Sequence, residues 1–162
     1  MASGMTRRQA REATFELLFE SEFTPERSPE DVLATAQLDR DLVEDAYVKK
    51  AYFGTMEHRG VIDVLLGRFS NGWKTDRMSR VSRAVLRLCT YEMLYCDDIP
   101  VHVSINEAVE LTKKFDDPKA KAFVNGVLNS IKNEIEQSGT KNIIAACESA
   151  LAAAQSETKS DE

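Results

Sequence analysis

Histidine and cysteine are scarce in this chain of 162 residues. The two histidines, His58 and His102, stand in no spacing that is typical of a metal site or a catalytic triad. The three cysteines, Cys89, Cys96 and Cys147, are odd in number and form no CxxC pair. This pattern indicates neither a disulfide framework nor a zinc site, so we expect no bound metal.

Long apolar runs and the motifs of common enzymes are also missing. No run approaches the roughly 18–20 residues that cross a membrane, and the N-terminal segment lacks the apolar core of a secretory signal. The chain contains no glycine-rich phosphate loop after a strand and no GxSxG or HExxH pattern. We therefore expect a cytoplasmic protein that is not an enzyme, carries no cofactor and does not contact membranes.

Glycine and proline are few, at seven and four copies, and the apolar residues recur mostly at spacings of three and four. That periodicity is typical of helices, and no segment alternates as a strand would. The sequence predicts an all-α protein, a compact bundle of about seven helices over residues 1–137. An Ala/Ser-rich extension over 138–162 can add a helix at 140–155 and is expected to be disordered from Ser156. The seven core helices are expected at 6–22, from 28, 41–54, around 61–69, 79–95, from 104 and 117–138.

Several expected helix ends have capping signals. Ser28 precedes Pro29 and two acidic residues, which suits the start of a helix. The segment Ser104-Ile105-Asn106-Glu107 fits a capping box, in which the Ser104 hydroxyl accepts from the third amide and Glu107 reaches back. Gly139 is expected to end the seventh helix.

Acidic residues outnumber basic ones by 27 to 21, which gives a formal net charge of −6 and by itself argues against a nucleic-acid binder. The basic residues are unevenly placed, however, because residues 68–96 hold six of them against two acids. Arg77, Arg80, Arg83 and Arg87 fall in this stretch. The last three share one side of the expected helix, which suits an RNA track, a protein interface or ion pairs with the acidic third helix.

The first expected helix opens with Arg7, Arg8 and Arg11. At about 100° per residue, Arg8 and Arg11 share a flank with Phe15 and Phe19, away from the expected core face. Arginines beside exposed aromatic rings can hold phosphates and stack on unpaired bases. The alternative is a solvated flank whose phenylalanines are covered by another helix.

Two lysines, Lys119 and Lys121, stand at the start of the last core helix, ahead of Phe123. Cations oppose the favourable sign at a helix N-terminus, so their presence favours a phosphate as the compensating charge. These residues form a second candidate contact with nucleic acid.

Four ordered blocks of the sequence carry a family pattern. They are Arg7–Glu12, then Trp73 with Arg77–Leu88 and Tyr91-Glu92, then Asp98-Ile99-Pro100 with Ser104–Leu111 and Lys113-Lys114-Phe115, and finally Phe123–Leu128. Together they span about residues 5–136 and resemble the NusB family. The resemblance implies two small helical lobes and a role in processive transcription antitermination on ribosomal RNA operons. It also implies binding of boxA-like single-stranded RNA together with NusE, a small-subunit ribosomal protein.

The resemblance also implies roles for individual positions. The residues that match RNA contacts are Arg7, Arg8, Arg11, Lys119, Lys121 and Phe123, and Phe123 is the candidate for base stacking. The residues that match the NusE contact are Phe19, Val81, Ser82 and Arg87. Other Nus factors and RNA polymerase would be reached through the complex, and both a monomer and a homodimer are compatible with the family.

Some positions depart from the family pattern, and other functions stay open. Gln9 and Ala122 stand where relatives have basic residues, and Ser82 stands where an acidic one is common. One alternative is the RNA-binding lobe of a ribosomal-RNA methyltransferase, which would need a longer chain. Another is a helical interaction protein without RNA binding. If residues 140–155 dock over an RNA- or partner-binding face, deletion of 138–162 should tighten binding.

Overall fold

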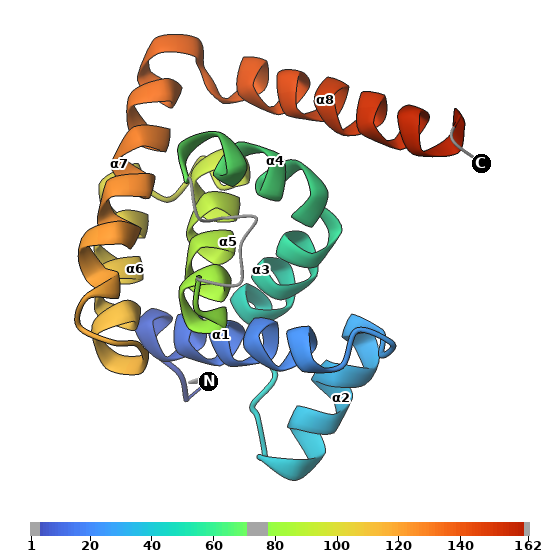
Figure 1. The fold of residues 1–162 in the computed structure, drawn as a ribbon. Helices are drawn as coiled ribbons and strands as arrows, with labels where there is room; N and C mark the ends of the chain where they lie inside the picture. Colours follow the sequence, from blue (N-terminus) through green and yellow to red (C-terminus); the bar gives the residue numbers. More distant parts are fainter. Residues whose placement is uncertain (1–3, 71–77, 161–162) are drawn as a thin grey trace.

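The computed structural model describes residues 4–70 and 78–160, and every regular element in these two stretches is an α-helix (Figure 1). The helices are α1 (Arg7–Phe23), α2 (Pro29–Asp39), α3 (Ala46–Glu57), α4 (Arg59–Phe69), α5 (Arg80–Tyr95), α6 (Val101–Phe115), α7 (Ala120–Ser138) and α8 (Thr140–Ser160). The prediction of an all-α bundle with an additional C-terminal helix is confirmed. Trp73, Arg77 and the break expected at Asn71-Gly72 lie outside the described residues.

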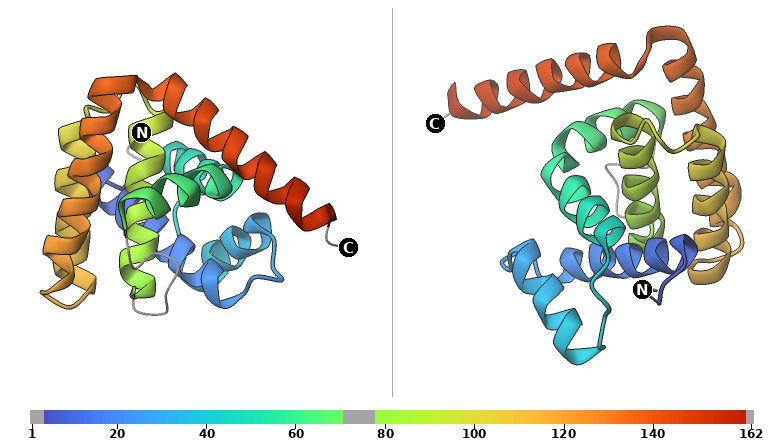
Figure 2. Two further views of the ribbon diagram at one scale, coloured as in Figure 1. Left: turned by 45° about the horizontal axis from the view of Figure 1, so that its top comes forward. Right: turned by 180° about the vertical axis from the view of Figure 1, so that it is seen from behind.

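Helix α5 forms the centre of the bundle and is covered by α1, α3, α4, α6, α7 and α8 (Figures 1 and 2). Most of its side chains are buried, among them Val85, Leu86 and Leu88. Residues 88–94 are buried on every face of the helix, so this part of α5 is surrounded by the core, whereas its arginines lie on one face nearer the N-terminus. The hydrophobic core takes in buried residues from every helix from α1 to α8, and their burial is the main source of stability.

A capping box fixes where α1 begins. The Thr6 hydroxyl accepts from the backbone N–H of Gln9 at 3.1 Å, and the Gln9 side-chain oxygen accepts from the backbone N–H of Thr6 at 2.9 Å. Two amide groups that have no partner within the helix are satisfied in this way. The first turn, which carries Arg7 and Arg8, is therefore held in helical form.

Two of the predicted helix ends are confirmed. Ser28 accepts from the backbone N–H of Asp31 and caps α2. Gly139 ends α7 with a φ of 81°, in the left-handed region that glycine adopts without strain. In both places the deciding interaction lies within a few residues of the helix end.

The predicted start of the third helix is wrong. The helix begins at Ala46 and not near Asp41, because Asp41 has a φ of 52°, which is incompatible with a right-handed helix. Asp45 provides the cap by accepting from the backbone N–H of Val48 at 3.0 Å. Val43, within the expected helix 41–54, is 48% exposed in the connection before α3.

The capping box predicted at Ser104 is also wrong. Helix α6 begins at Val101, directly after Pro100, so Ser104 lies inside the helix and caps nothing. Its hydroxyl instead donates to the buried carboxylate of Glu92 at 2.8 Å. The tertiary hydrogen bond to Glu92 is therefore formed in place of the local capping box that the sequence pattern predicts.

Helix α8 extends across the end of the bundle that is remote from α1 (Figures 1 and 2). It packs on α4 and also touches α5 and α7, and it buries Ile143 and Cys147 completely. Leu151 lies over Gly60, where an added Cβ would stand 2.7 Å from a Leu151 methyl carbon. The helix continues to Ser160, so the expectation of disorder from Ser156 is wrong for the residues up to that point.

Candidate nucleic-acid interface

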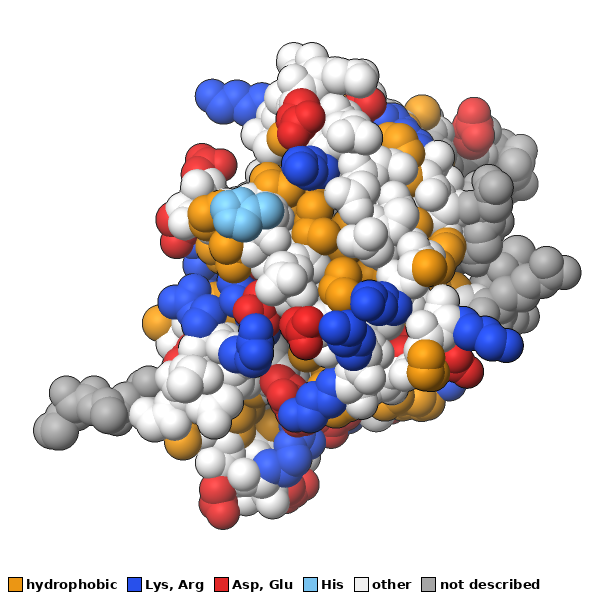
Figure 3. All heavy atoms as spheres, turned by 90° about the vertical axis from the view of Figure 1, so that its left-hand side faces the viewer, with side chains coloured by type: hydrophobic (Ala, Val, Ile, Leu, Met, Phe, Trp, Pro, Cys, Tyr) orange, Lys and Arg blue, Asp and Glu red, His pale blue; other side chains and the backbone are white. Residues whose placement is uncertain are grey.

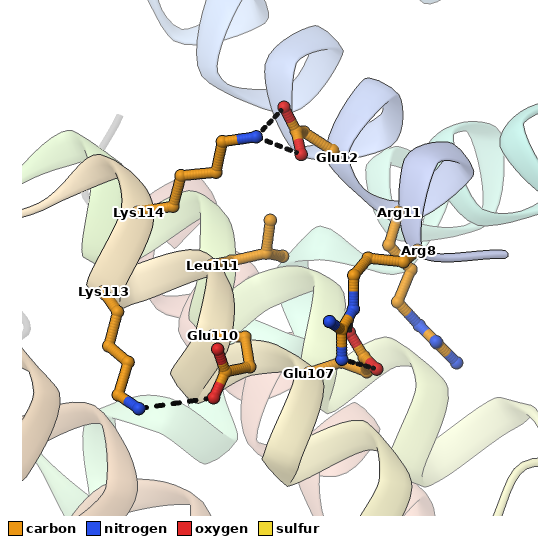
Figure 4. Close-up of a pocket in the computed structure, with 8 residues that line it drawn as sticks. All are labelled: Arg8, Arg11, Glu12, Glu107, Glu110, Leu111, Lys113 and Lys114. Carbon is orange, nitrogen blue, oxygen red and sulfur yellow. Dashed lines mark hydrogen bonds and ion pairs between the residues drawn. The ribbon is translucent and has the colours of Figure 1, made fainter. Parts of the chain in front are cut away.

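A groove between α1 and α6 gathers charged side chains from both helices (Figure 4). We call it the α1–α6 groove. It has a volume of about 360 Å³ and is lined by Arg8, Arg11, Glu12, Glu107, Glu110, Leu111, Lys113 and Lys114. Four of these residues are cationic and three are acidic, so the groove is slightly basic in an acidic protein.

Arg8 is the most accessible arginine of the groove, with a side chain that is 64% exposed. Its Nε and Nη2 donate to the two carboxylate oxygens of Glu107 at 3.1 and 3.0 Å. The hydrogen bond to Glu107 raises the pKa of Arg8, whose guanidinium thus stays charged. Because exposed ion pairs are weak, a phosphate can compete with Glu107 for this guanidinium.

Arg7 lies on the other side of the first turn of α1 and is exposed. Its guanidinium carbon stands 4.6 Å from the centre of the Tyr47 ring, in a cation–π arrangement. Arg7 and Arg8 therefore lean in different directions, one toward α3 and the other toward α6.

The prediction that Arg11 and Phe15 lie on an exposed flank of α1 is wrong. They are 6% and 3% exposed, because that flank faces α5 and α6. Phe15 packs against Phe115 at a ring distance of 4.9 Å, and Arg11 Nε donates to Glu92 at 2.9 Å. Arg11 thus helps to build the groove wall and has little surface to offer to an RNA strand.

Glu92 is the centre of a buried network that joins four helices. Its carboxylate accepts hydrogen bonds from Arg11 of α1, Tyr47 of α3 and Ser104 of α6. Burial raises the pKa of Tyr47, so the phenol remains a neutral donor. The network fixes the ring of Tyr47, and with it the surface on which the Arg7 guanidinium rests.

The start of α7 lines a second hollow of about 360 Å³, which we call the α7 hollow. It is lined by Met78, Ser79, Ser82, Asp116, Asp117, Lys119, Ala120 and Phe123. The Phe123 side chain is 38% exposed, unusual for a large apolar residue in this chain. Lys119 lines the same hollow, whereas Lys121 is exposed without belonging to the lining.

Asp116 shapes the α7 hollow. Its carboxylate accepts from the hydroxyls of Ser79 and Ser82 at 2.5 and 2.6 Å and from the backbone N–H of Asp117 at 2.7 Å. Burial opposes the charged form, but these hydrogen bonds prevail and lower the pKa of Asp116. The expectation that Ser82 contacts a partner is corrected here, because its side chain is 2% exposed and turned toward Asp116.

The arginine row of α5 forms ion pairs, which was one of its three interpretations, although its partners lie on α1 and α4 and not on the third helix. Arg80, Arg83 and Arg87 approach the carboxylate of Glu22 at 3.9, 3.6 and 2.7 Å. Arg87 also donates from Nε and Nη2 to both oxygens of Asp63 at 2.9 Å. The Arg87 side chain is only 14% exposed, and it links α5 to Glu22 of α1 and Asp63 of α4 beneath the surface.

An aromatic edge, which we define as Phe19, Phe23 and the overlying Arg80, lies at the C-terminal end of α1. The rings of Phe19 and Phe23 meet edge to face at 5.1 Å, and the Arg80 guanidinium carbon stands 4.6 Å from the centre of the Phe23 ring. Phe23 is 51% exposed. Sequence analysis missed Phe23, although its spacing of four from Phe19 could have indicated a shared face.

Lys113 and Lys114 were also missed as site residues, although they belong to one of the quoted family blocks. Lys114 Nζ donates to the two oxygens of Glu12 at 2.8 and 2.9 Å and crosses the groove (Figure 4). Figure 3 shows the molecule from the side of α6 and α7, where Lys and Arg side chains gather in the lower half together with acidic ones. The α6–α7 connection, which begins two residues after Lys114, links the groove to the α7 hollow.

Two further observations concern the described part of the chain. None of its helices is long and apolar enough to cross a membrane. Residues 4–70 and 78–160 contain no group of three or more histidine, cysteine or acidic side chains that could hold a metal ion.

Comparison with known proteins places these features in a family. A sequence model described as the NusB family matches residues 8–133. The transcription antitermination protein NusB of Bacillus subtilis (strain 168) is 42% identical over 137 residues, covering 83% of this chain and 100% of the relative. The structure of T. maritima NusB is 37% identical with a TM-score of 0.71, over 80% of this chain and 92% of that one. The family match ends before α8.

A second solved structure contains ligands. It shows the antitermination factors NusB and NusE in complex with double-stranded RNA. Its matching chain is 26% identical to this one with a TM-score of 0.70, over 80% of this chain and 99% of that one.

Proposed function

Because the chain belongs to the NusB family, we propose that it is a transcription antitermination factor that binds boxA-type RNA of ribosomal RNA operons together with NusE. The observation that carries the proposal is that exposed cations line two hollows, Arg8 in the α1–α6 groove and Lys119 beside Phe123 in the α7 hollow, with the exposed Arg7 on the same first turn of α1 as Arg8. The names of the relatives and the NusB–NusE–RNA complex support it. Such a factor acts in the cytoplasm, reaches other Nus factors and RNA polymerase through the complex, and needs no catalytic site.

The exposed cations would hold the phosphates of a single strand. A phosphate near Arg8 would replace Glu107 as the partner of the guanidinium. In the same way, a phosphate near Lys114 would replace Glu12 as the partner of the ammonium group. Bases can stack on the exposed ring of Phe123, since every base has a flat face that an aromatic side chain can cover. The acids of the groove weaken binding of any strand that is not well placed.

NusE is expected to supply the remaining affinity. The accessible part of the expected NusE contact is Phe19 and Val81, both half-buried, and the neighbouring Phe23 and Arg80 of the aromatic edge would extend it, whereas Ser82 and Arg87 are turned inward. Two ligands that touch the same protein and each other bind more tightly together than alone. We therefore expect modest RNA affinity without NusE and tight binding with it.

Fluorescence anisotropy with a labelled boxA-like RNA and a scrambled control, with and without NusE, tests the proposal. Arg8→Ala removes an exposed, ion-paired arginine of the groove. Arg40→Ala removes a comparable one, paired with Glu20 at 3.1 Å on the α2 side, and is the matched control. We expect Arg8→Ala alone to weaken binding and to reduce the slope of log affinity against log salt by about 0.7.

Two outcomes would contradict the proposed function. One is equal affinity for the boxA-like and the scrambled RNA in the presence of NusE. The other is an Arg8→Ala variant that behaves like Arg40→Ala at every salt concentration, which would favour a helical interaction protein without RNA binding.

A further inference from the structure

A third cavity lies on the opposite side of the α1 N-terminus from the α1–α6 groove. It has a volume of about 190 Å³, which is many times the space of about 15 Å³ that a single water molecule needs. We call it the Tyr47 cavity. It is lined by Arg7, Ala46, Tyr47, Lys50, Ala51, Tyr91, Cys96, Asp98 and Ile99.

The inner lining of the Tyr47 cavity is apolar and rigid. Ala51, Tyr91 and Cys96 are at most 6% exposed and belong to the core. Tyr47 forms one wall; the hydrogen bond to Glu92 holds it in place, and the Arg7 guanidinium stands over its ring. A planar group can enter beside the fixed Tyr47 if only the exposed Arg7 side chain moves, so little ordering is required on binding.

The rim of the Tyr47 cavity carries two cations, Arg7 and Lys50. Within the described residues, neither of them has an ion-pair partner, whereas Arg8 and Lys49, which follow and precede them in the chain, are paired with Glu107 and Glu44. Lys50 lines the cavity together with Cys96, and its charge opposes the rise that burial gives to the pKa of Cys96. The rim is therefore ready to receive negative charge.

An aromatic wall, an apolar floor and a cationic rim are together the features that recognise an unpaired nucleotide. The exposed Asp98 at the rim adds an acceptor for an exocyclic amino group. A free phosphate would leave the apolar floor unused, whereas a nucleotide brings a planar base for the apolar lining and phosphates for the two cations of the rim.

We propose that the Tyr47 cavity is a nucleotide subsite, in which one unpaired base of the bound RNA enters beside Tyr47 while Arg7 and Lys50 hold its flanking phosphates. This inference rests on the proposed function, because the strand that reaches the cavity is the one that also contacts Arg8. The strand passes around the first turn of α1, where the capping box of Thr6 and Gln9 keeps Arg7 and Arg8 on opposite sides. The footprint of the RNA therefore extends beyond the α1–α6 groove by at least one nucleotide.

Two adjacent lysines of α3 provide the first test. Lys50→Ala removes a cation from the cavity rim, and Lys49→Ala removes a cation that is paired with Glu44 and does not line the cavity. We measure the affinity of the full-length chain for boxA-like RNA in the presence of NusE over a range of salt. We expect Lys50→Ala to reduce the salt slope by about 0.7 and Lys49→Ala to leave it unchanged.

An abasic scan of the same RNA provides the second test. One abasic position should reduce affinity for the unaltered chain about tenfold, as expected when a stacked base is lost. Ala46→Trp, at an exposed position on the rim, should fill the slot and remove the sensitivity to that position alone. Ala34→Trp, on the exposed side of α2, is the control, and this variant should still lose affinity when that position is abasic.

The subsite is overturned if Lys50→Ala and Lys49→Ala behave alike, or if no abasic position couples to Ala46→Trp. If Arg8→Ala still weakens binding in that case, the proposed RNA-binding function stands without the subsite. Absence of RNA binding by the unaltered chain would overturn the proposed function and the subsite together.

Discussion

Arg11 and Glu92 form an ion pair that is almost completely shielded from water, with side chains 7% and 2% exposed. Transferring two charges into a protein interior is costly, so such a pair persists only when its geometry is good and its remaining atoms are bonded. Tyr47 and Ser104 provide these additional bonds to Glu92. The pair is a structural link that orients the helix on which Arg7 and Arg8 stand.

Replacing Arg11 tests this role. Arg11→Met leaves the buried Glu92 carboxylate without its counter-charge, and we expect the free energy of unfolding to fall by about 3 kcal/mol. Arg7→Met, at an exposed position, should change it by less than about 0.5 kcal/mol. Urea unfolding followed by circular dichroism measures both.

A second substitution separates charge from packing. Adding Glu92→Gln to Arg11→Met should restore part of the lost stability, since a neutral amide needs no counter-charge and can still bond to Ser104. An Arg11→Met variant with the stability of the unaltered protein would show that the pair contributes nothing.

At the scale of elements, the side chain of Asp116 ties the connection between α6 and α7 to α5. Asp116 lies in that connection and accepts from Ser79 and Ser82 at the start of α5, while the Ser79 hydroxyl itself caps α5 by accepting from the backbone N–H of Ser82. Lys119 and Phe123 lie three and seven residues after Asp116, so the hydrogen bonds of Asp116 determine where both side chains lie. The shape of the α7 hollow therefore depends on the charged carboxylate of Asp116.

The lowered pKa of Asp116 predicts a pH dependence of stability. A carboxyl group whose pKa is lower in the folded than in the unfolded state stabilises the fold above the unfolded value, about 3.9, and loses this effect as the pH falls through the folded value. Asp116→Asn should lower the free energy of unfolding by about 1 kcal/mol at pH 7, and the difference should shrink below pH 4. Asp97→Asn, in an exposed turn, is the control; a difference that is independent of pH would contradict the assignment.

The elements that sequence analysis predicted well are those decided by nearby residues. The spacing of apolar residues predicts where helices lie, and Ser28 and Gly139 act on atoms a few positions away. Ser104 shows where this reasoning fails, since its pattern fits a cap but a buried carboxylate twelve residues earlier competes successfully for its hydroxyl.

The same distinction applies to the candidate site. Arg8 and Arg11 lie on one flank of α1, and only the packing of α5 and α6 makes one exposed and the other buried. The partners of Arg11, Ser82 and Arg87 lie 81, 34 and up to 65 residues away, so their inward orientation could not be predicted from spacing. The exposure of Arg7, Lys119, Lys121 and Phe123 agrees with their expected role as contacts, and none of the described helices covers them completely.

At the scale of the whole molecule, the proposed RNA face and α8 occupy different ends. Helix α8 packs on α4, α5 and α7 and lies away from α1 in the views of Figures 1 and 2. Deletion of residues 138–162 was expected to tighten RNA binding only if residues 140–155 covered a binding face, and α8 does not cover the α1–α6 groove. The buried residues of α8 instead make this helix part of the core.

Deletion of residues 140–162 should accordingly destabilise the protein without changing its RNA affinity. The loss of the buried Ile143 and Cys147 side chains should lower the free energy of unfolding by about 2 kcal/mol. Deletion of 155–162, which removes no buried side chain among the described ones, is the control. Denaturant unfolding and RNA anisotropy measure the two properties, and tighter RNA binding after the longer deletion would contradict this view.

The network around Glu92 also determines when, during synthesis of the chain, α1 can reach its final orientation. Helix α1 leaves the ribosome first, but the carboxylate that anchors Arg11 lies 81 residues later, and the α6 serine that bonds to it later still. Contacts of such wide sequence separation close a long loop and form late in folding. A nascent chain that ends before Ser104 thus has the cations of α1 without the orientation that makes them selective, and competence for RNA is acquired only after most of the protein has been translated.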